Sequence, residues 1–87
     1  MIYSISLARA AANYFKRCDA PTRERLREKL EKLKADPFDP QHSKQLKGRK
    51  EERAARVGGL RILFRVMGQE VIVATIDTRG QVYKHTS

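Results

Sequence analysis

The hydrophobic and polar positions of the chain change from a mainly helical period to a period of two at about residue 52. Residues 2–6 alternate and predict a short strand. Residues 7–17 place apolar side chains on one helical face, and residues 21–35 carry leucines three or four positions apart among charged side chains. Pro21 suits a first helical turn, and the two prolines of segment 36–40 end the second helix. We therefore expect a strand followed by two helices.

Alternation in the second part of the chain predicts antiparallel strands joined by tight turns. These strands are expected at residues 52–57, 60–67 and 70–77, with a last short strand at 81–84. Gly58-Gly59 is a hairpin signal, and Gly68-Gln69 fits a type II′ turn. The order of elements predicts an α+β fold, in which a small antiparallel β-sheet packs on two N-terminal helices. Residues 1–87 are expected to form a single domain.

The Gly-Gly turn also predicts the register of its hairpin, with Arg56 opposite Arg61 and Glu52 opposite Arg65. One face of the sheet then collects apolar side chains that can be buried against the helices: Val57, Leu60, Ala55, Ile62, Phe64, Val66, Val71 and Val73. The other face holds the three arginines together with Leu63, Ile72, Ala74 and Ile76.

Arg56 and Arg61 should destabilise the sheet, because like charges directly opposite each other repel. An anion or an acidic side chain between them would offset this cost, and Glu52 lies too far along the ladder to serve both. Arginine binds phosphate bidentately and stays charged at any relevant pH. The arginine face is therefore a candidate phosphate site. The alternative is that these side chains simply extend from a solvent-exposed face.

The charge balance favours a polyanionic partner. The 87 residues include 19 Lys and Arg but 10 Asp and Glu, for a net charge of +9. Nucleic acid is the commonest partner of such a chain, because neutralising phosphates releases counterions. The alternative partners are an acidic protein and a membrane surface. A further alternative is that the chain is a basic protein without a nucleic-acid role. A basic run leads into the strand of Arg56 and extends the same patch: Lys44, Lys47, Arg49 and Lys50.

Several classes of function find no support in the sequence. The single cysteine, Cys18, cannot form an internal disulfide or a multi-cysteine zinc site, and His42 and His85 are too isolated to suggest a ligand set. We therefore expect no metal and no cofactor. No apolar stretch approaches the roughly 18 residues of a spanning helix, and the N-terminus lacks the order of a signal peptide. A cytoplasmic protein without a membrane role is expected.

The ordered motifs resemble those of the RelE/ParE toxin superfamily. The resemblance runs through Leu46-Lys47-Gly48, the segment from Arg56 to Phe64, Val71-Ile72-Val73 and Arg79-Gly80-Gln81-Val82-Tyr83. It implies a toxin of a prokaryotic toxin–antitoxin pair, held inactive in a hetero-oligomer with a cognate antitoxin. RelE-like members cleave mRNA in the ribosomal A site, whereas ParE-like members poison DNA gyrase. It also implies a RelE-like fold with an active sheet face.

The resemblance assigns roles to particular residues. Arg61 matches the family arginine that supports the phosphate, and Arg79 and Tyr83 match a late arginine and tyrosine. Under the nuclease hypothesis Arg61 stabilises the phosphorane with Arg56 and Arg79, and Tyr83 stacks on a base or orients the 2′-OH.

Proton transfer is the less defined part of this hypothesis. His85 and Glu52 are the candidates for it. The family lysines on the strand before the turn are replaced by Glu52 and Ala54. This departure favours the rival, a ParE-like gyrase inhibitor without nuclease activity. A non-catalytic nucleic-acid-binding module is a further alternative.

Overall fold

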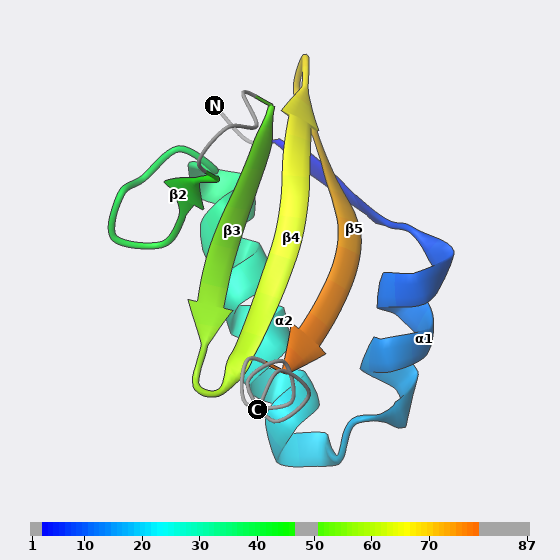
Figure 1. Ribbon diagram of the computed structural model, residues 1–87. Coiled ribbons are helices and arrows are strands. Elements are labelled where there is room, and N and C mark those ends of the chain that lie inside the picture. The colour runs from blue at the N-terminus through cyan, green and yellow to red at the C-terminus, as the bar shows by residue number, and fades with distance from the viewer. Residues whose placement is uncertain (1–2, 47–50, 79–87) are drawn as a thin grey trace, which may run out of the picture.

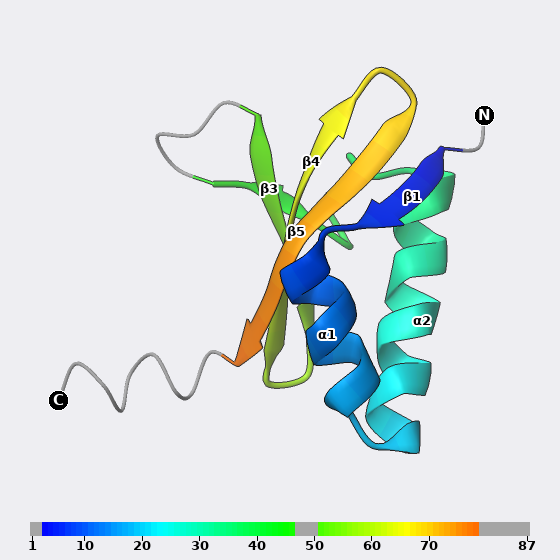
Figure 2. The same ribbon diagram turned by 90° about the vertical axis from the view of Figure 1, so that its right-hand side faces the viewer.

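The computed structural model describes residues 3–46 and 51–78. The elements in chain order are β1 (Ser4–Leu7), α1 (Arg9–Arg17), α2 (Ala20–Ala35), β2 (Lys44–Gln45), β3 (Glu52–Val57), β4 (Leu60–Met67) and β5 (Glu70–Thr78). Both helices lie on the same side of the sheet, and no helix of the described chain covers the opposite face (Figures 1 and 2). The predicted α+β fold is confirmed, and the expected strand at 81–84 lies outside the described residues.

The sheet is mixed, and the prediction of a purely antiparallel sheet was wrong in this respect. The strand order is β1-β5-β4-β3-β2. β1 pairs with β5 in parallel, with Ile5 opposite Val71, whereas the other pairs are antiparallel. Alternation along a strand fixes the face of each side chain but carries no information about the direction of the neighbouring strand. The short strand β2 was also expected to be loop.

The helices begin and end close to the predicted positions for identifiable reasons. The first helix starts at Arg9 rather than at residue 7, because Leu7 belongs to β1 and pairs with Val73. The second helix is capped by Asp19, whose Oδ1 accepts a hydrogen bond of 3.2 Å from the backbone N–H of Thr22. Neither helix of the described chain is long and apolar enough to cross a membrane.

The core lies between the helices and one face of the sheet. Its buried members are Ala11, Leu26, Leu33, Ala55, Ile62, Phe64, Val71, Val73 and Ile76. All of the apolar sheet residues predicted to face the helices are buried or pack against this cluster. The hairpin register is also confirmed, because Arg56 pairs with Arg61 and Glu52 with Arg65. Gly58 takes a φ of 57° in the hairpin turn, a conformation that favours glycine.

A β-bulge in β5 overturns one part of the predicted face pattern. Leu63 pairs with Thr75 and Phe64 pairs with Val73, so Ala74 is an extra residue without a partner in β4. The bulge reverses the alternation beyond it. Ile76, which was expected on the arginine face, is 3% exposed in the core. Asp77 is placed on the arginine face instead, directly opposite Arg61.

Candidate phosphate-binding cleft

Three charged side chains form a row across the open face of the sheet. Arg56 on β3 stands opposite Arg61 on β4, and Arg61 stands opposite Asp77 on β5. The hairpin turn sets the first pairing and the bulge in β5 sets the second. The acidic side chain that sequence reasoning sought beside the arginines is therefore present, and it comes from the far side of Arg61.

The contact between Arg61 and Asp77 is an ion pair without a hydrogen bond. The distance from Arg61 Nε to Asp77 Oδ1 is 3.6 Å, and each side chain is 36% exposed. Both of these atoms are buried and lack a hydrogen-bond partner among the described residues. The carboxylate limits where the guanidinium can lie but does not satisfy its hydrogen-bond donors. The Arg61 Nε–H and the Asp77 Oδ1 atom are therefore held together by charge alone within the described residues.

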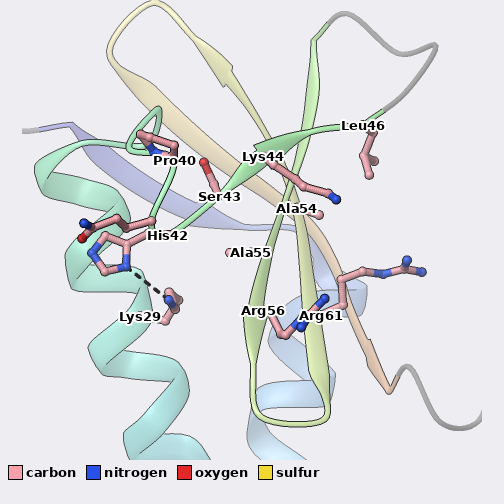
Figure 3. Close-up of a pocket in the computed structure, with 11 residues that line it drawn as sticks. Lys29, Pro40, His42, Ser43, Lys44, Leu46, Ala54, Ala55, Arg56 and Arg61 are labelled. Carbon is pink, nitrogen blue, oxygen red and sulfur yellow. Dashed lines mark hydrogen bonds between the residues drawn. The ribbon is translucent and has the colours of Figure 1, made fainter.

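A cleft of about 430 Å³, called here the basic cleft, opens beside this row at the edge of the sheet. β2 pairs with β3 only through Gln45 and Lys44, opposite Arg53 and Ala54. The strand from Ala55 onward therefore lies beyond the end of β2, where the cleft opens. Five basic or imidazole side chains line the cleft: Lys29, His42, Lys44, Arg56 and Arg61. Figure 3 shows Lys29 and His42 on the side of α2, and Arg56 and Arg61 on the strands opposite.

The loop between α2 and β2 holds His42 in place. The backbone N–H groups of His42 and Ser43 donate to the carbonyl oxygen of Asp39 at 2.9 and 3.0 Å. Ser43 Oγ is buried and donates to the carbonyl oxygen of Pro37 at 2.6 Å, and Arg53 Nε donates to Ser43 Oγ at 3.1 Å. These bonds anchor the loop to β3, so the imidazole has a fixed position beside α2.

The structure brings together some of the predicted site residues. Lys44, Arg56 and Arg61 line the basic cleft, and Arg65 lies on the same face of the sheet but outside the cleft lining. The remaining predicted residues lie outside the described part of the chain: Lys47, Arg49, Lys50, Arg79, Tyr83 and His85.

Sequence reasoning missed three residues of this region. Lys29 is one of the charged side chains of residues 21–35, to which the sequence assigned no binding role, and His42 was considered only as an isolated metal ligand. Asp77 was missed because nothing in the alternation of apolar and polar residues signals the bulge at Ala74. The sole hint for His42 was its place next to the basic run.

The comparison with protein families gives one match. The model of the family described as "ParE toxin of type II toxin-antitoxin system, parDE" matches residues 5–83, which is nearly the whole chain. A search of curated protein sequences gave no match.

Solved structures share the fold. A chain of the RelBE2 toxin–antitoxin complex from Mycobacterium tuberculosis is 19% identical, and the alignment covers 91% of this chain and 100% of that one, with a TM-score of 0.77. The isolated E. coli RelE toxin is 20% identical over 97% of this chain and 94% of that one, with a TM-score of 0.77. The archaeal RelE–RelB complex from Pyrococcus horikoshii OT3 gives 16% identity, coverages of 93% and 99%, and a TM-score of 0.76. Likeness at these identities is a likeness of fold.

Proposed function

The chain belongs to the ParE toxin family of type II toxin–antitoxin systems, and we propose that this toxin acts as a ribosome-dependent mRNA endoribonuclease. The family match extends over residues 5–83 and confirms the resemblance of the sequence motifs to the RelE/ParE superfamily. The observation that carries the proposal of nuclease activity is the basic cleft, where Arg56 and Arg61 face a cavity that can take a phosphodiester.

Cleavage of RNA by its own 2′-OH group passes through a phosphorane with extra negative charge, which positioned cations stabilise. Arg61 suits this role, because Asp77 restricts its position and its side chain lines the basic cleft. Arg56 lies directly opposite, and adds a second guanidinium that makes no ion pair within the described residues. Under this proposal Arg79 and Tyr83 complete the site and His85 transfers protons, because Glu52 pairs with Arg65 at the other end of β3 and does not line the basic cleft.

Lys44 supports the nuclease against the gyrase alternative. The lysines that the family carries on the strand before the turn are absent here, and one of those positions is Ala54. Lys44 on β2 is the direct cross-strand neighbour of Ala54 and lines the basic cleft. Directly paired side chains on a sheet are neighbours in space. An ammonium group on the adjacent strand therefore replaces the one that Ala54 lacks.

We further propose that the partner of this toxin is a cognate antitoxin, with which it forms a hetero-oligomer in the cytoplasm. Two of the solved structures with this fold are toxin–antitoxin complexes. The net charge of +9 favours an acidic antitoxin segment on the open face of the sheet. Such a segment would compete with RNA for Arg56 and Arg61.

A ParE-like inhibitor of DNA gyrase is the second candidate function. The description of the matching family supports it, because that description names ParE. Such an inhibitor would use the basic face for binding and would need no group for proton transfer.

One pair of assays separates the two functions. The purified toxin is added to translating ribosomes, where mRNA cleavage is mapped by primer extension, and to gyrase in a supercoiling assay. The nuclease proposal expects cleavage that falls roughly a hundredfold or more in Arg61→Ala. Arg27→Ala is the matched control, because Arg27 is an exposed arginine of α2 that pairs with Glu24 at 3.1 Å. Gyrase inhibition with intact mRNA would refute the nuclease proposal.

A further inference from the structure

The basic cleft continues beyond the sheet to a pair of residues that the proposed reaction does not use. Lys29 on α2 and His42 in the following loop line the end of the cleft next to the helix (Figure 3). Lys29 Nζ lies 3.3 Å from His42 Nδ1, and both side chains are partly buried. The pair is 13 residues apart in the chain and is brought together by the loop that Ser43 anchors.

The chemistry of this pair fixes the direction of its hydrogen bond. An ammonium group has three donors and no acceptor, so Lys29 Nζ donates and His42 Nδ1 accepts. The other charged side chains that line the cleft are all positive: Lys44 from β2, Arg56 from β3 and Arg61 from β4. No carboxylate is among the described residues that line the cleft. Like charges that converge on a concave surface focus a field that attracts anions.

We propose that Lys29 and His42 form a second phosphate site, which binds a backbone phosphodiester of the RNA strand whose scissile phosphate lies at Arg61. This inference rests on the proposed function for the identity of the strand. The volume of about 430 Å³ falls within the usual range of ligand pockets, roughly 300–1,000 Å³. The strand would cross from the open face of the sheet, past the edge of β3, towards α2.

His42 restricts the position of the ammonium group at this site. The hydrogen bond from Lys29 Nζ to His42 Nδ1 uses one of the three ammonium donors. The phosphate of the strand accepts from the remaining donors, so the imidazole positions the lysine for the phosphate and the lysine supplies the charge.

The test measures binding rather than cleavage. The probe is a short single-stranded 2′-O-methyl oligouridine, which cannot be cleaved because its 2′-OH groups are blocked. Dissociation constants are measured by fluorescence anisotropy from about 0.05 to 0.2 M KCl. The variants are Lys29→Gln and His42→Gln. Lys32→Gln is the matched control, because Lys32 is an exposed lysine of the same helix that does not line the cleft.

Each variant has its own expected result. Lys29→Gln should lower the salt slope of log affinity by about 0.7, the value for one phosphate contact to a single strand. Its affinity should fall roughly tenfold or more, as expected for a lost hydrogen bond from a charged group. His42→Gln should weaken binding but leave the salt slope unchanged, because the lysine that contacts the phosphate is retained. Lys32→Gln should lower affinity less than Lys29→Gln does.

Two results would overturn this site. In one, Lys29→Gln and Lys32→Gln change the salt slope equally. In the other, His42→Gln binds the oligonucleotide as tightly as the wild type does. Thermal melts show whether each variant is folded. If the site passes this test but the toxin does not cleave mRNA on ribosomes, the second phosphate site stands and the proposed nuclease function fails. If cleavage depends on Arg61 while Lys29 and His42 have no effect on binding, the nuclease stands and the second site fails.

Discussion

Removal of the Asp77 carboxylate should destabilise the fold through the row of charges on the open face of the sheet. In the wild type Asp77 attracts Arg61, which also faces Arg56 across the hairpin. Asp77→Asn keeps the shape of the side chain but removes its charge. The two arginines then oppose each other without a neighbouring carboxylate, so the variant loses an attraction and keeps a repulsion.

The structure limits the size of this effect. At the 3.6 Å between Arg61 Nε and Asp77 Oδ1, two unit charges attract by about 1 kcal/mol in bulk water and about 5 kcal/mol at an effective dielectric constant of about 20. Both side chains are 36% exposed, so water screens the pair and the lower value is the better guide. We expect Asp77→Asn to lower the free energy of unfolding by about 1 kcal/mol. For a domain of this size that corresponds to a fall of about 4–8 °C in melting temperature.

Thermal and urea unfolding of the wild type and Asp77→Asn at low salt and in about 1 M NaCl would measure the effect. The difference should shrink at high salt, where the Debye length is about 3 Å. Glu31→Gln is the control, because Glu31 pairs with Lys34 at 3.9 Å on an exposed face of α2. Its effect should stay within about 0.5 kcal/mol. An Asp77→Asn variant as stable as the wild type would refute the reasoning, as would an effect that is equal at both salt concentrations.

Three further predictions concern the core and the start of α2. Phe64→Ala should cost about 3–5 kcal/mol in urea unfolding, since Phe64 is 1% exposed at the centre of the core; a cost below about 1 kcal/mol would contradict this. Hydrogen bonds from the side chain and backbone of Thr22 lower the pKa of Asp19. The Asp19 carboxylate therefore stabilises the fold above the usual pKa of aspartate, and this stabilisation is lost as the pH falls through the lowered pKa of the folded state. Asp19→Ala should therefore lower the melting temperature at neutral pH, and the difference should shrink at about pH 2. Burial first, and the charge of Asp19 second, raise the pKa of the Cys18 thiol, so Cys18 should react with iodoacetamide at neutral pH more slowly than glutathione does.

The part of the fold that could be predicted from the sequence is the part governed by short-range rules. A two-residue Gly-Gly turn sets the register of its hairpin, so the pairing of Arg56 with Arg61 followed from the sequence and is confirmed. The parallel pairing of β1 with β5 could not be predicted in the same way. The direction of this pairing depends on where the two helices lead the chain back to the sheet. The alternation of Tyr3 and Ile5 fits a parallel and an antiparallel neighbour equally well.

The candidate site depended on two features that strand alternation does not reveal. Lys29 and His42 come from different elements, and the loop anchored by Ser43 brings them together. The bulge at Ala74 inserts one residue into β5, which moves Ile76 into the core and places Asp77 opposite Arg61. Alternation assumes one residue per position of the ladder, and a single extra residue reverses every later assignment. The same bulge therefore completes the core and supplies the counter-charge of Arg61, so one local irregularity sets both the packing of β5 and the ion pair beside the basic cleft.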